Sequence, residues 1–145
     1  METVLARNGE AGVEASSAGQ GEVTVGRFVI PYRVFGSGID YIVCVNGAQQ
    51  TIASWRSFVS HFSKDYRIVT FDFPGQGRAR ILSGPLSIHI DEQIEVVHEI
   101  TRGTVPHQSF YLVGISWGGI VALTYAARYP ATVDKLLLAS VALRP

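Results

Sequence analysis

Residues 110–119 have the sequence FYLVGISWGG. The apolar run Phe110–Val113 is typical of a strand that is covered on both faces. It leads directly into a G-x-S-x-G motif around Ser116, and a helical apolar period follows. A serine in this motif, between a strand and a helix, indicates a sharp turn that lifts its side chain above the sheet. The stretch therefore predicts an α/β fold with Ser116 as a candidate nucleophile.

The glycines on either side of Ser116 fit the same interpretation. A serine hydroxyl is a poor nucleophile at neutral pH, so it must be held with little freedom near a base and oxyanion donors. Gly114 and Gly118 leave room for strand and helix to approach each other. The helix also directs its free N–H groups at the site. The alternative is a strand–helix turn that holds Gly and Ser by chance, but the strand before and the helix after favour the nucleophile.

The rest of the chain alternates between two kinds of apolar pattern. Short continuous runs predict strands at residues 41–45, 68–71, 110–113 and 136–139. Stripes with helical spacing separate them. The stripes are formed by Trp55, Phe58, Val59 and Phe62, by Ile90, Ile94 and Val97, and by Ile120, Leu123, Thr124 and Ala127. We expect Ser54 to cap the first helix, Asp91 to begin the second and Pro130 to end the third.

This alternation predicts how the elements are arranged in space. The order β-α-β-α-β-α-β implies a mostly parallel sheet with right-handed crossovers and helices on its faces. Ligands of such sheets bind outside the carboxyl ends of the strands. Upstream, residues 22–27 and 28–35 are rich in β-branched and aromatic side chains and predict an antiparallel hairpin. Residues 1–20 predict a flexible tail, so the folded domain is expected over residues 21–145.

Composition excludes several classes of function. Twelve Lys and Arg balance twelve Asp and Glu, so there is no net charge to attract nucleic acid or anionic lipid. The single cysteine, Cys44, cannot form an internal disulfide. No apolar run approaches the roughly 20 residues that a membrane helix needs. The N-terminus also lacks a signal-peptide pattern, so we expect a cytoplasmic protein.

A second loop fits the same site as Ser116. The strand that ends at Val45 runs into Asn46-Gly47-Ala48, and a glycine there allows a backbone N–H to turn toward a tetrahedral oxyanion. The expected donors are the N–H of Ala48 and the N–H of Trp117, the residue after the nucleophile. A plain turn at the end of a strand is the alternative interpretation.

With these motifs, residues 21–145 resemble the N-terminal half of the α/β-hydrolase superfamily. Two motifs are similar to those of a narrower group within the superfamily. The first is Asn46-Gly47-Ala48 followed by Thr51, Ala53, Ser54 and Trp55, and the second is Ser116-Trp117-Gly118-Gly119. That group contains the synthase of the rhamnolipid lipid moiety and the hydroxyacyl carrier-protein to coenzyme A transacylase. The resemblance implies an ester or thioester substrate, carried on acyl carrier protein or coenzyme A in the narrower group. The Pro74-Gly75-Gln76-Gly77 loop is instead similar to generic hydrolases.

The acid and base of a catalytic triad are not evident in the sequence. In the superfamily they follow the serine in the order acid, then histidine. After Ser116 the chain has one acid, Asp134, at the start of a strand and therefore at the wrong edge of the sheet, and no histidine. Four histidines precede the serine: His61, His89, His98 and His107. Of these, His89 is the least excluded as a base, because it lies in the loop or first turn before the second predicted helix.

The missing triad leaves several hypotheses open. We expect the chain to be the N-terminal part of a longer serine hydrolase or acyltransferase and to be inactive alone. The alternative is a non-catalytic remnant or interaction module with the same fold. An oxidoreductase or lyase on this scaffold is a third possibility, because the fold hosts many chemistries.

A few further residues have two interpretations each. We expect Asp72 to fix the following turn rather than touch substrate. Arg78 and Arg80 fit solvated loop charges better than contacts with phosphopantetheine or a carrier protein. Cys44 fits a small buried hydrophobe better than a thiolate. No G-x-G-x-x-G or phosphate-loop motif and no metal-ligand spacing occur, so we expect no cofactor and no metal.

Overall fold

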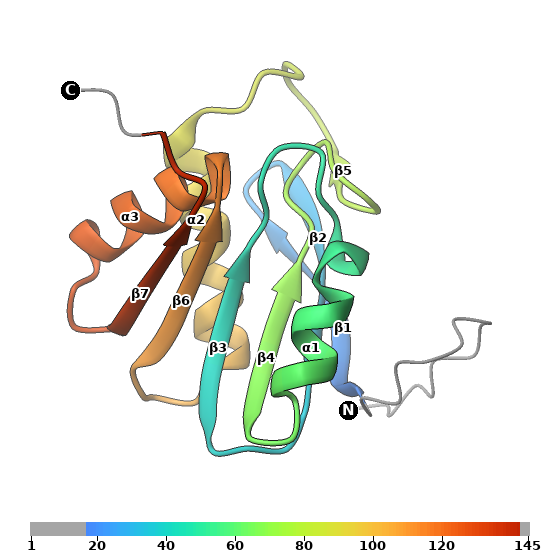
Figure 1. Cartoon of the computed structure of the whole chain (residues 1–145). Helices are drawn as coiled ribbons and strands as arrows, with labels where there is room; N and C mark the ends of the chain where they lie inside the picture. Colours follow the sequence, from blue (N-terminus) through green and yellow to red (C-terminus); the bar gives the residue numbers. More distant parts are fainter. Residues whose placement is uncertain (1–16, 143–145) are drawn as a thin grey trace.

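The computed structural model describes residues 17–142, which form one sheet with helices on both faces (Figure 1). In chain order the elements are β1 (Ser17–Val25), β2 (Phe28–Phe35), β3 (Asp40–Val45), a 3₁₀ turn (Ile52–Trp55), α1 (Arg56–Phe62), β4 (Tyr66–Phe71), β5 (Arg80–Ile81), α2 (Ile90–Thr104), β6 (Phe110–Ile115), α3 (Trp117–Arg128) and β7 (Val133–Ala139). Every predicted strand and helix is present in the predicted order. Within residues 17–142, no helix is both long and apolar enough to cross a membrane.

The sheet joins a parallel part to an antiparallel part. Its order is β1-β2-β4-β3-β6-β7, with β5 paired to β2. Strand β3 lies parallel to β4 and β6, and β6 lies parallel to β7. The hairpin β1–β2 adds to β4 in the antiparallel direction. Because parallel strands point the same way, the loops that follow β3, β4 and β6 meet at one edge of the sheet.

Strand β3 shows how both faces of the parallel part are buried. Tyr41, Val43 and Val45 belong to the core cluster that contains the inner faces of α2 and α3. Ile42 and Cys44 belong to a second cluster with the 3₁₀ turn and α1. Successive side chains of a strand point to opposite faces, so a continuous apolar run serves both clusters. Figure 1 shows α1 on one face of the sheet and α2 and α3 on the other.

Three boundaries differ from the sequence predictions. The tail predicted over residues 1–20 falls mostly outside the described residues, but residues 17–20 belong to β1, where backbone pairing with β2 extends the hairpin. Ser54 is not an N-cap. A 3₁₀ turn precedes α1, Thr51 is its N-cap, and the Thr51 N–H donates to Ser54 Oγ at 3.1 Å. Helix α2 begins at Ile90, one residue before the predicted Asp91.

The apolar stripe predicted for α3 is also wrong. Ala127 of that stripe is exposed, and Ile120, Leu123 and Thr124 are only half-buried. The buried residues are Gly118, Gly119, Val121, Ala122 and Tyr125. Positions 118, 121, 122 and 125 have the same i, i+3, i+4, i+7 spacing as the predicted stripe. The buried face begins with small residues because the short connection from β6 brings the start of the helix close to the sheet.

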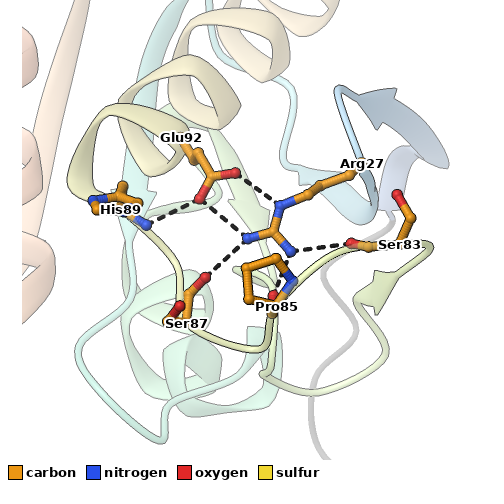
Figure 2. A network of polar contacts seen from close by, with 6 residues as sticks. All are labelled: Arg27, Ser83, Pro85, Ser87, His89 and Glu92. Carbon is orange, nitrogen blue, oxygen red and sulfur yellow. Dashed lines mark hydrogen bonds and ion pairs between the residues drawn. The ribbon is translucent and has the colours of Figure 1, made fainter.

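One arginine fixes the segment that leads into α2 (Figure 2). Arg27 lies in the turn between β1 and β2, and its guanidinium donates to the backbone carbonyl oxygens of Ser83, Pro85 and Ser87. It also pairs with Glu92 in the first turn of α2, with Nε–Oε1 and Nη2–Oε2 distances of 2.8 and 3.2 Å. The planar guanidinium thus ties an irregular segment to both the sheet and the helix.

The same pair lowers the pKa of Glu92 to about 2. The hydrogen bond from Arg27 is the largest cause, and the hydrogen bond from the His89 N–H, 3.0 Å long, is the next. Both favour the ionised carboxylate. The carboxylate therefore contributes stability that depends on pH.

We expect Glu92→Gln to lower the free energy of unfolding at pH 7 and to have less effect in acid. The pKa is lower in the folded protein than the value of about 4.3 in the unfolded chain. The stabilisation is therefore present above that value and is lost as the pH falls toward 2. Urea unfolding at neutral pH and at about pH 3 measures the difference between wild type and variant. Glu95→Gln is the control, because Glu95 is exposed on the same helix. An equal, pH-independent loss in both variants would contradict the prediction.

Candidate active site

Ser116 occupies a strained turn between β6 and α3. Its φ is 54°, a value that residues other than glycine seldom adopt. The turn is fixed on both sides: the Ser116 N–H donates to the Ala139 carbonyl oxygen at 2.9 Å, and its own carbonyl oxygen accepts the Gly119 N–H at 2.9 Å. Ser116 is exposed, whereas the strand before it is largely buried. The serine is thus held at the carboxyl edge of the sheet and is open to solvent.

Three glycines let α3 lie this close to the sheet. A Cβ at Gly118 would overlap the backbone oxygens of Val45 and Asn46, and a Cβ at Gly119 would overlap the side chain of Val141. A Cβ at Gly114 would lie 2.7 Å from the Cα of Gly119. Real Cβ contacts of this length do not occur, so a side chain at Gly114 or Gly118 would force the helix away from β6 or β3, and one at Gly119 would displace Val141.

The loop after β3 lies directly beside the serine. A Cβ at Gly47 would come within 3.4 Å of Ser116 Cβ and 2.9 Å of the Ile115 carbonyl oxygen. The structure therefore brings the Asn46-Gly47-Ala48 loop and the Ser116-Trp117 turn together, as the sequence predicts. No hydrogen bond to another residue in the range 17–142 occupies the Ala48 N–H. The Trp117 N–H is at the first position of α3, where a helix offers no acceptor.

Asn46 holds this loop from inside the protein. Its side chain is fully buried, and both ends of its amide are used. Oδ1 accepts the Trp55 indole N–H at 2.6 Å, and Nδ2 donates to the Phe71 carbonyl oxygen at 2.9 Å. Asn46 therefore connects the ends of β3 and β4 with the start of α1. In this environment a buried amide without partners would be costly, so the loop has one favourable position.

Two glutamines complete the support of Gly47. Its N–H donates to Gln50 Oε1 at 2.6 Å, and its carbonyl oxygen accepts a hydrogen bond from Gln76 Nε2 at 2.8 Å. Both side chains were missed by the sequence analysis. For Gln76 the sequence offers one signal, its position in the Pro74-Gly75-Gln76-Gly77 loop after a neighbouring strand. That position does not reveal that Gly47 is its hydrogen-bond partner.

Trp117, the residue after the serine, is held by α2. Its side chain is 40% exposed, and its indole N–H donates to Gln93 Oε1 of α2 at 2.7 Å. This bond links α3 to the first half of α2, whose beginning is fixed by Arg27. A fixed, partly exposed indole gives an apolar surface next to Ser116.

Asp72 has the turn role that the sequence favoured. It is 4% exposed, and its carboxylate accepts the Ile52 N–H at 2.8 Å and the Arg78 N–H at 3.1 Å. The carboxylate thus anchors both the 3₁₀ turn and the loop after β4. The side chain of Arg80 makes an exposed pair with Glu22 at 3.3 Å, which fits a solvated loop charge.

Cys44 is fully buried, and burial raises the pKa of its thiol. This agrees with the prediction of a small buried hydrophobe rather than a thiolate. Across the part of the chain that the structure describes, no group of three His, Cys, Asp or Glu side chains could hold a metal ion.

The remaining acid–base candidates are not hydrogen-bonded to the serine within the described residues. His61 is exposed on α1, His107 is exposed in the loop before β6, and His98 stacks on Tyr129 with ring centroids 4.4 Å apart. Asp134 is exposed at the amino end of β7. His89 is the N-cap residue of α2. Among residues 17–142, none of these five side chains makes a hydrogen bond with Ser116.

Comparison with known proteins gives a consistent result. Residues 40–144 match a family model described as alpha/beta hydrolase fold. Monoacylglycerol lipase ABHD6 of Homo sapiens is 35% identical over 99 residues, which is 67% of this chain and 29% of that protein. Epoxide hydrolase 4 of Mus musculus is 27% identical over 101 residues, or 70% of this chain and 28% of its own length.

A solved structure extends the likeness to the fold. A thioesterase domain from the curacin biosynthetic pathway aligns with a TM-score of 0.80 and 22% identity. The alignment covers 88% of this chain and 47% of that domain. The chain therefore spans less than half the length of each of these three proteins.

We expect Gly118→Ala to destabilise the protein, because its Cβ would overlap two backbone oxygens that cannot move independently. Overpacking of this kind costs about 1–3 kcal/mol. Gly103→Ala in α2 is the matched control, since a Cβ there meets no atom within 4 Å. It should stabilise the helix by roughly 0.5–1 kcal/mol. Urea unfolding measures both, and a Gly118→Ala protein as stable as wild type would contradict the close contact between α3 and β3.

Proposed function

The chain belongs to the alpha/beta hydrolase fold family, and on that premise we propose that Ser116 is the nucleophile of a serine hydrolase or acyltransferase. The observation that carries the proposal is the backbone of Ser116, at φ 54° in the turn between β6 and α3. Strain of this kind gathers at active sites, where surrounding contacts maintain it. The exposed serine also lies at the sheet edge where α/β proteins bind ligands.

In the proposed reaction, Ser116 Oγ attacks the carbonyl carbon of an ester or thioester while its proton passes to a general base. The carbonyl oxygen becomes an oxyanion, and the N–H groups of Ala48 and Trp117 donate to it. Collapse of the tetrahedral intermediate breaks the bond to the leaving oxygen or sulfur, which departs with the proton held by the base. Water, or a second acceptor, then removes the acyl group from Ser116.

The substrate class we infer is an acyl ester or thioester. The name of the human relative, a monoacylglycerol lipase, supports ester chemistry. The exposed indole of Trp117 beside the serine suits an acyl chain. A narrower form is the transfer of a 3-hydroxyacyl group from acyl carrier protein or coenzyme A, supported by the Asn46-Gly47-Ala48 and Ser116-Trp117-Gly118-Gly119 motifs.

We assign the general base and its acid partner to residues outside this chain. The support is that no histidine among residues 17–142 makes a hydrogen bond with Ser116, and that the chain corresponds to only 29% of the human lipase. On this proposal residues 21–145 contribute the nucleophile and oxyanion donors, and the chain alone is inactive. His89, at the N-cap of α2, is the first alternative base.

A second candidate function follows from the same observation. A fold that keeps the strained serine without a base would act as a non-catalytic interaction module. The mouse relative is named an epoxide hydrolase and the human relative a lipase, so similar chains carry out different reactions. Covalent labelling of the serine separates the two functions.

We expect a serine-directed fluorophosphonate to label the longest reading frame that contains this chain, with the adduct on Ser116 by mass mapping. Ser116→Ala should abolish labelling and ester turnover while leaving the unfolding midpoint nearly unchanged, because the exposed side chain contributes little packing. Labelling of the 145-residue chain alone would contradict an external base, and His89→Ala would then be the next variant. No labelling of either form, or turnover retained in Ser116→Ala, would favour the non-catalytic module.

A further inference from the structure

We propose that Gln76 is a positioning residue that orients the oxyanion donor of Ala48 through the Gly47–Ala48 peptide. The inference rests on the proposed function of Ser116. On this proposal the Gln76 side chain does not contact the substrate. It acts on the Ala48 N–H, which does.

The contacts of Gln76 fix the orientation of its amide. Nε2 donates to the Gly47 carbonyl oxygen at 2.8 Å, and Oε1 accepts a weaker hydrogen bond from Asn46 Nδ2 at 3.4 Å. Because Asn46 Nδ2 is a donor only, it selects the rotamer that presents Nε2 to Gly47. The Gln50 backbone N–H also donates to the Gly47 oxygen, at 3.2 Å. The carbonyl of Gly47 is thus held by two donors.

Holding this carbonyl sets the direction of the Ala48 N–H. The peptide bond between Gly47 and Ala48 is planar and trans, so its C=O and N–H point in opposite directions. A donor on the oxygen also polarises the peptide and strengthens the N–H as a donor. The Ala48 N–H itself has no hydrogen-bond partner within residues 17–142.

The sheet order shows which way the N–H points. Strand β3 lies between β4 and β6, so the loop after β3 has the loop after β4 on one side and the Ser116 turn on the other. Gln76 lies in the loop after β4 and donates to the Gly47 carbonyl oxygen from that side. The N–H of the same peptide is therefore directed to the Ser116 side, where a Cβ placed on Gly47 would lie only 3.4 Å from Ser116 Cβ. This is the geometry that an oxyanion donor needs.

The test compares variants of the longest reading frame that contains the chain. Gln76→Met keeps the length of the side chain and removes the donor. Gln76→Glu keeps the Oε1 acceptor for Asn46 and also removes the donor, so it serves if the methionine variant does not fold. Gln108→Met is the matched control, because Gln108 Nε2 makes the same kind of bond, to the Ile39 carbonyl oxygen at 3.2 Å, at the opposite edge of the sheet.

Loss of an oxyanion donor costs about 100- to 1,000-fold in kcat. We expect Gln76→Met and Gln76→Glu to lower kcat for p-nitrophenyl acetate by about tenfold or more, with KM changed far less, because the Ala48 N–H acts in the transition state. Affinity for a phenylboronic acid, which forms a tetrahedral adduct on serine, should fall in parallel. The unfolding midpoints should match that of Gln108→Met.

Two results would overturn the inference, and they differ from failure of the proposed function. If Ser116→Ala is inactive but both Gln76 variants keep kcat and boronic-acid affinity within about twofold of Gln108→Met, Gln76 has no positioning role. The same conclusion holds if kcat falls only in proportion to a loss of folded protein. If Ser116→Ala keeps its turnover, the proposed function fails, and the role of Gln76 fails with it.

Discussion

The close approach of α3 to the end of β3 is the constraint on which the rest of the structure depends. At Gly118 the helix backbone touches the carbonyl oxygens of Val45 and Asn46, with no space for a side chain between them. At this distance the connection from β6 must reverse within one residue, and Ser116 takes the positive φ that this requires. The same approach brings Gly47 against the serine. Packing between backbones, rather than a side-chain contact, therefore assembles the site.

Side-chain hydrogen bonds hold the surrounding loops in place. Asn46 joins β3, β4 and the start of α1 through both ends of its amide, and Asp72 anchors two further backbone N–H groups nearby. Arg27 gives the segment before α2 a comparable anchor, and Gln93 of that helix holds Trp117. Catalytic groups on loops are effective only when such supporting contacts limit their freedom. In this protein the candidate donors are backbone N–H groups, so the supporting hydrogen bonds must fix the orientation of peptide groups.

The family relationship bears on why the candidate site holds the proposed nucleophile and donors but no evident base among residues 17–142. The three similar proteins are each more than twice the length that this chain covers, and their names include a lipase and an epoxide hydrolase. A shared fold does not fix the reaction, because reaction and substrate depend on particular side chains around a common frame. The frame described here supplies the serine turn, the loop after β3 and the partly exposed indole of Trp117.

The sequence by itself determined the order and type of the main strands and helices and the position of Ser116, because periodicity and the G-x-S-x-G motif are local properties of the chain. It also predicted that the Asn46-Gly47-Ala48 loop would meet the serine turn, since parallel strands end at the same edge. It did not predict the two-residue strand β5 or the 3₁₀ turn before α1. Only the tertiary structure decided which face of α3 is buried, because two sets of positions share the same helical spacing. Only it paired Gln76 with Gly47, and Arg27 with Glu92, which are 29 and 65 residues apart. Polar side chains in loops find partners according to which strand ends are neighbours, and that order is set by the packing of the whole sheet.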